Sequence, residues 1–311
     1  MGILVLLSSR ARIQGIARDM PSANISLLAP AKLNLHLSIV GRRPDGYHLL
    51  ETLMVKLDLA DKLDLAIRNQ GIRLDIRGAA LPTGEDNLVV RAANAFFQAA
   101  ALKPAVEIVL EKRIPVAAGL GGGSSDAAAT LKGLNSLYGS PLTRDQLLDL
   151  GVNLGADVPF FLYPGTTALA QGIGDELSPG PVISGVYYFL LLNPGWPLST
   201  GWVYKNYKLK LTSIRKKLIY FPLNEGSFTI SRVLHNDLES VVIPRYPEIK
   251  TMKDRLVAEG AVKALMTGSG PTVFGVFLRR EKAERARIRL NALDRGKWVV
   301  IMARNLQSPQ F

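Results

Sequence analysis

Apolar residues in the first part of the chain follow the pattern of strands. Residues 26–40 (SLLAPAKLNLHLSIV) have β-compatible apolar patterning, and residues 49–59, 63–68 and 72–76 continue this strand-rich opening. The period then changes, because residues 87–102 carry an apolar stripe at helical spacing, formed by Leu88, Val89, Ala92, Ala95 and Phe96. We therefore expect strands followed by a helix.

The rest of the chain alternates between the two kinds of element. A strand at 105–110 is predicted to run into a glycine-rich loop at 115–123, and a helix at 124–138 follows. Thr143 and Gln146 have the spacing of a capping box, which predicts a helix over 143–154. Further strands are expected at 187–192, 262–266, 272–278 and 298–302, and further helices at 200–207, 246–259 and 281–293.

This order predicts an α+β protein with two domains. The composition shifts near residues 178–181 (SPGP), so we place an N-terminal domain at 1–179 and a C-terminal domain at 180–311. Strand patterning begins only near Asn24, so the residues before about 25 are expected to be a disordered or mis-assigned extension, with Met20 as an alternative start. Residues 205–227 are basic and without a clear period, and we expect a surface excursion there.

The composition narrows the chemistry. Of the 311 residues, 48% are hydrophobic, and 38 Lys+Arg against 26 Asp+Glu give a formal net charge of +12. The absence of cysteine excludes disulfides, thiolate nucleophiles and cysteine-bound metals. His36, His48 and His235 lie too far apart for a short metal-ligand spacing, so any metal is expected to be a hard cation held by oxygens. No export signal or membrane span is recognisable, and we expect a cytoplasmic protein without a membrane partner.

The segment 115–129 (PVAAGLGGGSSDAAA) is the most informative one for function. Exposed N–H groups of a glycine-rich loop, together with the positive end of the next helix, form a phosphate site, and Ser124 or Ser125 is expected to cap that helix. A Walker A interpretation fails because no Gly-Lys-Ser/Thr follows at the required spacing. A dinucleotide-binding interpretation fits poorly, since the acidic residue expected about 20 residues later is missing. A purely structural turn is the remaining alternative.

This loop resembles the central phosphate-binding motif of the galacto-, homoserine, mevalonate and phosphomevalonate kinase superfamily. Residues 30–35 (PAKLNL) and 266–272 (MTGSGPT) resemble its first and third motifs. Together with 41–48 (GRRPDGYH) and 154–161 (LGADVPFF), they are similar to the branch that phosphorylates a cytidine-diphosphate-linked methylerythritol in the non-mevalonate route to isoprenoids. The resemblance implies a two-domain α+β kinase whose active site lies in the cleft between the domains, with ATP and Mg²⁺ as cofactors.

Two charged residues stand out because their surroundings are apolar. Lys32 lies within an apolar strand, and Asp157 lies among apolar residues just after a helix, so a pair between them would resolve both oddities. By resemblance, Asp157 is the base that accepts the hydroxyl proton, and Lys32 orients and polarises that hydroxyl. A purely structural ion pair is the alternative.

The resemblance also assigns residues to ATP and the metal. The expected ATP-binding residues are Pro115, Val116, Ala117, Ala118, Gly119, Leu120, Gly121, Gly122, Gly123, Ser124 and Ser125. The metal ligands stay undetermined, and the oxygens of Ser124, Ser125 and Asp157 are the available donors.

The substrate residues are expected around a cytosine. A nucleobase offers a flat face for stacking and an edge for hydrogen bonds. The resemblance implies that Tyr47 stacks on the cytosine and that His48 forms a hydrogen bond with it. We place a second aromatic at Tyr204, with Trp202 as the competing candidate. Asn34, Thr200, Gly268, Ser269 and Gly270 complete the expected substrate site. His36 is interpreted as a packing histidine and His235 as structural.

Three rival interpretations differ in what they require. Another kinase of the superfamily, acting on homoserine, mevalonate or a sugar, would have no base for Tyr47, His48 and Tyr204 to hold. Nucleic-acid binding is the rival that the charge of +12 suggests, but the basic residues are scattered and no aromatic-interleaved basic stripe is present, so we expect no nucleic-acid partner. A non-catalytic homologue would not need Lys32 and Asp157. We expect a monomer or a weak homodimer that acts on a small molecule.

Overall fold

The computed structural model describes residues 24–208, 230–294 and 296–308. The expectations about the N-terminal extension and Met20 fall on residues 1–23, outside the described residues, and so does most of the predicted surface excursion, residues 209–227. No helix in the described ranges is long and apolar enough to cross a membrane.

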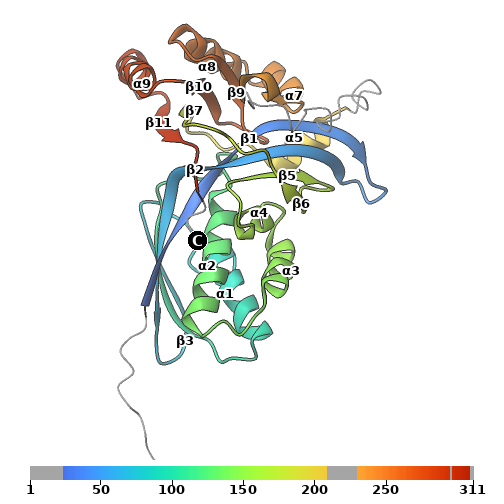
Figure 1. Cartoon of the computed structure of the whole chain (residues 1–311), viewed down its shortest axis with the longest axis vertical. Coiled ribbons are helices and arrows are strands. Elements are labelled where there is room, and N and C mark those ends of the chain that lie inside the picture. The colour runs from blue at the N-terminus through green and yellow to red at the C-terminus, as the bar shows by residue number, and fades with distance from the viewer. Residues whose placement is uncertain (1–23, 209–229, 295, 309–311) are drawn as a thin grey trace, which may run out of the picture.

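Two long strands, β1 (Asn24–Arg42) and β2 (His48–Ile67), pair antiparallel and connect the lower and upper parts of the molecule (Figure 1). They belong to a sheet with the order β3-β4-β2-β1-β8, in which β5 pairs with β2 and β6 pairs with β5. The other strands of this sheet are β3 (Gly71–Arg77), β4 (Ala105–Glu111), β5 (Thr167–Gln171), β6 (Glu176–Pro179) and β8 (His235–Asn236).

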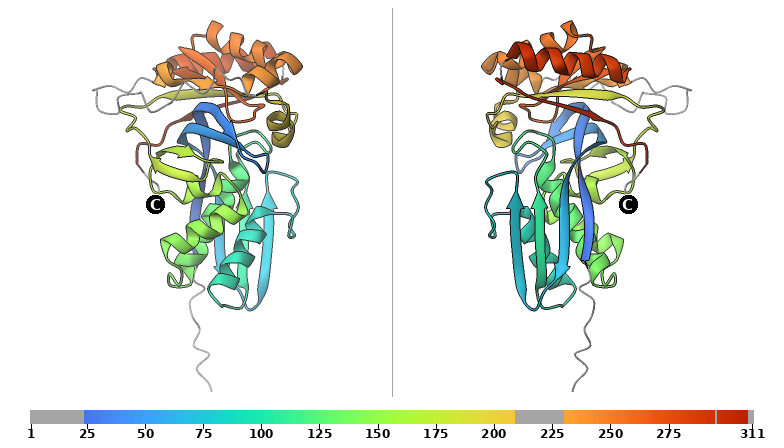
Figure 2. Two further views of the ribbon diagram at one scale, coloured as in Figure 1. Left: turned by 90° about the vertical axis from the view of Figure 1, so that its right-hand side faces the viewer. Right: turned by 90° about the vertical axis from the view of Figure 1, so that its left-hand side faces the viewer.

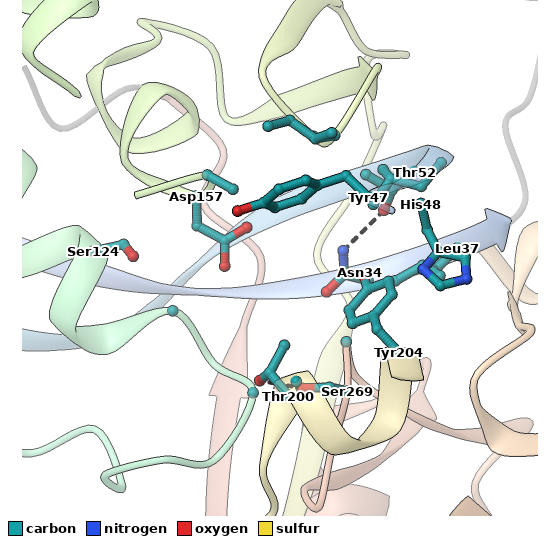
Figure 3. Close-up of a pocket in the computed structure, with 18 of the residues that line it drawn as sticks. Asn34, Leu37, Tyr47, His48, Thr52, Ser124, Asp157, Thr200, Tyr204 and Ser269 are labelled. Atoms are coloured by element: carbon teal, nitrogen blue, oxygen red, sulfur yellow. Dashed lines mark hydrogen bonds between the residues drawn. The ribbon is translucent and has the colours of Figure 1, made fainter. Parts of the chain in front are cut away.

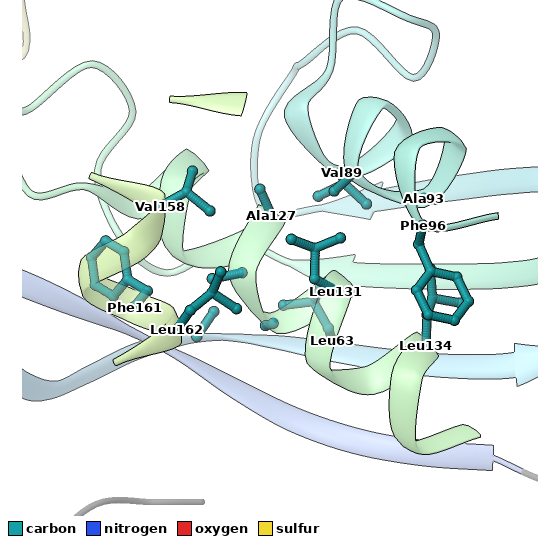
Figure 4. Packing of buried hydrophobic residues seen from close by; sticks show 14 of the residues in the cluster. Leu63, Val89, Ala93, Phe96, Ala127, Leu131, Leu134, Val158, Phe161 and Leu162 are labelled. Carbon is teal, nitrogen blue, oxygen red and sulfur yellow. The ribbon is translucent and has the colours of Figure 1, made fainter. Parts of the chain in front are cut away.

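Four helices cover one face of the lower half of this sheet (Figure 2). They are α1 (Leu88–Ala99), α2 (Gly122–Leu137), α3 (Arg144–Leu154) and α4 (Val158–Leu162). Their buried side chains, such as Phe96, Leu131 and Phe161, form one apolar core with Leu63 of β2 (Figure 4). The core fixes α2, and with it the glycine-rich loop that precedes it.

A second sheet, with the order β11-β7-β10-β9, forms the upper part. Its strands are β7 (Tyr188–Asn193), β9 (Lys263–Met266), β10 (Val273–Phe277) and β11 (Val299–Arg304). Successive side chains of a strand point to opposite faces of its sheet. In β7, Leu190 and Leu192 pack in the apolar cluster that contains α8 and α9, whereas Phe189 and Leu191 pack in the cluster that contains β1 and β2. The helices of this part are α5 (Thr200–Asn206), α6 (Ile230–Val233), α7 (Glu239–Arg245), α8 (Glu248–Ala258) and α9 (Arg280–Asp294).

The side chains of β1 that face the first core in the early part of the strand are followed by side chains that face the second sheet. Leu27 and Ala29 belong to the core under the helices, whereas Ala31, Leu33 and Leu35 pack with the second sheet, and the register with β2 shifts between Pro30 and Lys32. An irregularity of this kind re-aims the side chains that follow it. Lys32 and Asn34 therefore lie on the other face of β1, where Lys32 reaches Asp157 at the start of α4 and both side chains lie near Gly268.

The structure confirms the α+β class and most predicted elements, and it corrects two of them. The two strands expected at 49–59 and 63–68 are one strand, β2, because the polar Asp61 in the expected gap is fully buried and hydrogen-bonded. Helix α2 starts at Gly122 rather than at residue 124, and its N-cap is Gly121 at φ +72°, so neither serine caps it. The short elements α4, β5, β6, α6, β8 and α7 were not predicted. The domain boundary near residue 180 stays a prediction, since β6 ends at Pro179 but β8 returns to pair with β1.

Candidate active site

Lys32 and Asp157 meet at the centre of the molecule. Nζ of Lys32 lies 3.4 Å from Oδ2 of Asp157 and donates to Oδ1 of Asn34 at 2.6 Å. The Lys32 side chain is 5% exposed and that of Asp157 is 37% exposed, so the carboxylate is the member of the pair that a ligand can reach. Asp157 occupies the N-cap position of α4, which places it at the open end of that helix.

Asn34 is held by threonines from two other elements. Its Nδ2 donates to Oγ1 of Thr52 at 2.8 Å, and that hydroxyl donates to the carbonyl of His36 at 2.6 Å. Its backbone N–H donates to Oγ1 of Thr267 at 3.1 Å. Sequence reasoning missed both threonines. For Thr52 the available signal was the one that revealed Lys32, a polar residue inside an apolar strand.

The two glycine-rich loops touch backbone to backbone. Gly119 has φ +77°, and a Cβ on it would lie 2.7 Å from the carbonyl oxygen of Thr267 and 2.9 Å from that of Gly270. Only glycine permits this approach without a shift of backbone. The N–H of Lys32 also donates to the carbonyl of Leu120 at 2.9 Å, which ties the first loop to β1. The three motif segments are therefore one connected assembly.

The loop before α2 forms one wall of a cavity of about 370 Å³. Residues 115–124 line one side, and Leu81, Pro82, Asn87 and Leu88 line another. The first N–H groups of a helix have no partner within it, and the helix dipole adds partial positive charge there. The cavity therefore offers an apolar side for a flat ring and an electropositive helix end for phosphates.

Ser125 is the exception among the expected ATP-binding residues. It is 1% exposed and lines neither of the two cavities described here, and its N–H donates to the carbonyl of Gly121 at 2.9 Å. Its hydroxyl faces a small space beside Leu27, Pro30 and Lys132. Of the expected set, residues 115–124 therefore line the loop cavity and Ser125 does not.

A larger cavity of about 710 Å³ lies on the other side of the loop (Figure 3). It gathers most of the expected catalytic and substrate residues, namely Lys32, Asn34, Tyr47, His48, Asp157, Thr200, Tyr204, Gly268 and Ser269. Gly119, Gly121 and Ser124 line both cavities, so the two spaces adjoin at the loop. Gly270 does not line the larger cavity, and its carbonyl lies instead against Gly119.

Aromatic side chains form one end of the larger cavity. The rings of His48 and Tyr204 lie 5.7 Å apart between centroids, at 41° to each other, and the Tyr207 ring meets His48 edge-on at 6.0 Å. Tyr47 is 61% exposed and reaches across the cavity toward Asp157 (Figure 3). Trp202 packs edge-on against Tyr246 and does not line this cavity.

Burial and nearby charges favour the neutral forms of the His48 imidazole and the Tyr204 hydroxyl. Burial, with a further contribution from the positive charge of Arg42, lowers the pKa of His48 below its ordinary value. Burial and the negative charge of Asp157 raise the pKa of the Tyr204 hydroxyl. At neutral pH, the imidazole and the phenol are therefore uncharged, as partners of an uncharged base should be.

The remaining polar contacts join the second half of the chain to the site. Oγ1 of Thr200 lies 2.8 Å from Oγ of Ser269. His36 is buried, with Nδ1 3.0 Å from the carbonyl of Val233, in agreement with a packing role, and His235 pairs with Asp237 at 2.7 Å. Neither histidine lines the larger cavity.

Comparisons with known proteins agree with this geometry. Residues 87–165 match the model of the GHMP kinases N terminal domain, and residues 226–294 match that of the GHMP kinases C terminal. The chain is 46% identical over 263 residues to the 4-diphosphocytidyl-2-C-methyl-D-erythritol kinase of Geobacter sulfurreducens, covering 84% of this chain and 93% of that one. It is 48% identical to the protein of the same name from Syntrophotalea carbinolica, covering 88% and 96%.

Solved structures show the same arrangement. A crystal structure of 4-(cytidine 5'-diphospho)-2C-methyl-D-erythritol kinase superposes with a TM-score of 0.74 at 35% identity, over 90% of this chain and 99% of that one. A homoserine kinase from Cytophaga hutchinsonii superposes with a TM-score of 0.69 at 19% identity, over 95% and 98%, which shows a shared fold.

Proposed function

Because the chain belongs to the 4-diphosphocytidyl-2-C-methyl-D-erythritol kinase family of the GHMP kinases, we propose that it transfers the γ-phosphoryl group of ATP to the 2-hydroxyl of 4-diphosphocytidyl-2-C-methyl-D-erythritol. This reaction is a step of the non-mevalonate route to isoprenoid precursors. The observation that carries the proposal is the identity of 46–48% to proteins of that name over most of both chains.

The two adjoining cavities suit a reaction between two large ligands. We assign ATP to the loop cavity of about 370 Å³ and the cytidine substrate to the larger cavity of about 710 Å³. The transferred phosphoryl group then passes at Gly119, Gly121 and Ser124, which border both. Phosphoryl transfer depends mainly on positioning and charge neutralisation, and a shared border provides the first of these.

We assign the proton acceptor to Asp157 and the neighbouring positive charge to Lys32. The Asp157 carboxylate is the exposed member of the pair and lines the substrate cavity. Lys32 is fixed by Asn34 and Asp157, so its ammonium already stands where negative charge develops during the transfer. A purely structural ion pair would not require an open carboxylate in the substrate cavity.

The cytosine is assigned to the aromatic end of the substrate cavity. Tyr204 supplies a half-buried ring beside the neutral His48, and Tyr47 covers the cavity from its exposed side. Thr200 and Ser269 are close enough to share a ligand hydroxyl or phosphate. We propose that the protein acts as a monomer or weak homodimer in the cytoplasm.

Magnesium fits this arrangement as a companion of ATP. Across the described part of the chain, no group of three or more His, Asp and Glu side chains could hold a metal ion by itself. Ser124 and Asp157 are oxygen donors that line the substrate cavity beside the phosphate loop, and Mg²⁺ commonly binds one or two protein oxygens together with phosphates. When bound, the ion would neutralise phosphate charge during transfer.

A coupled ADP-release assay with Mg-ATP tests the proposal. The cytidine-diphosphate methylerythritol is offered beside homoserine, mevalonate and galactose, and we expect turnover with the cytidine compound alone. Turnover with another acceptor instead would keep the kinase chemistry and refute the assignment of the aromatic end. A protein that releases ADP with none of the four would refute the proposed function.

A further inference from the structure

A buried ion cluster of Asp61, Lys112 and Asp126 lies beside the phosphate loop, and Lys112 and Asp126 also line the loop cavity. Asp61 comes from β2 and is fully buried. Its Oδ1 accepts the N–H groups of Arg113 at 2.5 Å and Ile114 at 2.8 Å, where the chain leaves β4 for the loop. Its Oδ2 accepts a hydrogen bond from Nζ of Lys112. One carboxylate therefore fixes the residues that precede the loop.

The same lysine reaches the other end of the loop. Nζ of Lys112 donates to Oδ2 of Asp126, in the first turns of α2, at 2.7 Å. A Cβ on Gly122 would lie 3.3 Å from this Nζ, so the ammonium is packed directly against the loop backbone. The ammonium thus joins the β4 end of the loop to α2, and the loop between them has little freedom to change shape.

The two carboxylates are not equivalent. Both oxygens of Asp61 are hydrogen-bonded, whereas Oδ1 of Asp126 is buried and has no hydrogen-bond partner in the part of the chain that the structure describes. Two carboxylates face one ammonium, so the cluster carries an excess negative charge when both are ionised. Asp126 is therefore the poorly compensated group of the cluster.

We propose that Asp61 and Lys112 are positioning residues that hold the phosphate loop in its ATP-binding shape, and that Asp126 weakens nucleotide binding by placing a carboxylate behind the phosphates. This inference rests on the proposed assignment of ATP to the loop cavity. In Asp61→Asn the amide nitrogen must face either the Lys112 ammonium or the N–H groups of Arg113 and Ile114, so one set of donors loses its acceptor and the residues before the loop are disturbed. Removing the charge of Asp126 leaves the Asp61–Lys112 pair balanced.

The test compares isosteric variants of the two aspartates. Asp61→Asn, Asp126→Asn and the control Asp64→Asn are assayed for KM of ATP, KM of the cytidine substrate, thermal midpoint and Kd of ADP by calorimetry. Asp64 is the matched control, because it lies on the same strand and pairs with Lys62 at the surface at 2.9 Å. Calorimetry with ADP needs no phosphoryl acceptor. Absence of turnover by the wild type would therefore refute the proposed function and still leave the cluster testable.

We expect Asp61→Asn to raise KM for ATP and Kd for ADP about tenfold or more, with KM for the cytidine substrate changed less than about twofold. Asp126→Asn should lower both nucleotide constants below the wild-type values, and Asp64→Asn should change neither. Unchanged constants in Asp126→Asn would refute the weakening role of Asp126. Equal losses for the two buried aspartates, or equal rises in both KM values for Asp61→Asn, would overturn the inference.

If Asp61→Asn does not fold, a second variant, Lys112→Arg, tests the positioning role of the cluster. Lys112→Arg keeps the positive charge, but a planar guanidinium does not reproduce the geometry of the two hydrogen bonds that the ammonium donates to Asp61 and Asp126. It should raise Kd for ADP about fivefold or more while KM for the cytidine substrate stays within about twofold. An unchanged Kd for ADP in Lys112→Arg would overturn the positioning role.

Discussion

Nζ of Lys32 and Oδ2 of Asp157 lie 3.4 Å apart in the larger cavity, although one residue comes from a long strand and the other caps a short helix far along the chain. Asn34 holds the lysine at 2.6 Å, and the register shift in β1 sets the face on which both residues stand. The pair is therefore fixed before any ligand arrives. Such preorganisation is what an electrostatic role in phosphoryl transfer requires.

Asp157→Asn should abolish turnover and leave nucleotide binding nearly intact. Loss of a general base costs roughly 10²–10⁴-fold in rate, while the amide keeps the shape of the side chain. The measurement is kcat by ADP release together with Kd for ADP by calorimetry. A normal kcat in this variant would remove Asp157 as the base, and a large rise in Kd would show that it mainly organises the nucleotide.

Tyr204→Ala should raise KM for the cytidine substrate by about tenfold or more, with KM for ATP unchanged. A base that stacks on an aromatic ring gains roughly 1–3 kcal/mol, and this contact is lost with the ring. Trp202→Ala is the matched control from the same helix, because Trp202 packs on Tyr246 outside the cavity. If Trp202→Ala shows the larger KM effect for the cytidine substrate, the base lies elsewhere.

Asn236→Ala should lower kcat/KM for both substrates by loosening the second glycine-rich loop. Nδ2 of Asn236 donates to the carbonyls of Met266 at 2.7 Å and Gly268 at 2.8 Å, and its Oδ1 accepts the N–H of Leu238 at 3.0 Å. Removing one buried amide leaves several groups unpaired, at a cost of about 1–3 kcal/mol for each such group. Thermal melts and steady-state kinetics measure the two effects.

Ser240→Ala serves as the control for Asn236→Ala. Its hydroxyl donates to the carbonyl of Asp237 at 2.6 Å on the exposed side of the same turn. Wild-type kinetics in Asn236→Ala would mean that the loop keeps its shape without the amide.

The sequence predicted the pairing of Lys32 with Asp157 because each charged residue conflicts with its local pattern. Lys32 interrupts an apolar strand and Asp157 an apolar segment, and such conflicts are visible without any knowledge of the fold. The glycine-rich loop was recognisable for the same reason. The core elements followed from hydrophobic period alone, as Leu190 and Leu192 against Phe189 and Leu191 illustrate.

The missed features depend on contacts between distant segments. The gap between the strands predicted at 49–59 and 63–68 contains Asp61, whose residue type is unfavourable in strands, but Asp61 is stabilised within β2 by N–H groups 52 and 53 residues away. Asn236 and Thr267 act through backbone groups of other segments, which no local pattern reveals. Helix α2 begins early because Gly121 adopts a positive φ, a choice that the serines alone do not indicate.

Lys56 gives a prediction about pH and stability. This β2 residue is buried, and among the described residues no carboxylate pairs with it. Its Nζ donates to the carbonyl of Tyr163 at 2.6 Å and lies 5.3 Å from the centre of the Phe160 ring. Burial, with a further contribution from the positive charge of Lys132, lowers the pKa of Lys56 to about 7. The folded protein therefore releases a proton from Lys56 that the unfolded chain retains up to about pH 10.5.

Lys56→Met should accordingly gain most over the wild type at low pH. Below pH 7 Lys56 is protonated in both the folded and the unfolded protein, so the wild type bears the full cost of burying the ammonium. Between about pH 7 and 10.5 Lys56 is protonated in the unfolded chain only. The free energy of unfolding of the wild type therefore rises with pH relative to the variant, by up to about 1.4 kcal/mol per pH unit. Urea unfolding at pH 6, 7, 8 and 9 measures the difference. Lys62→Met is the control, since Lys62 lies at the surface of the same strand. A Lys56→Met difference that does not change between pH 7 and 9 would mean that the ammonium stays charged in the folded protein, stabilised by Tyr163 and Phe160.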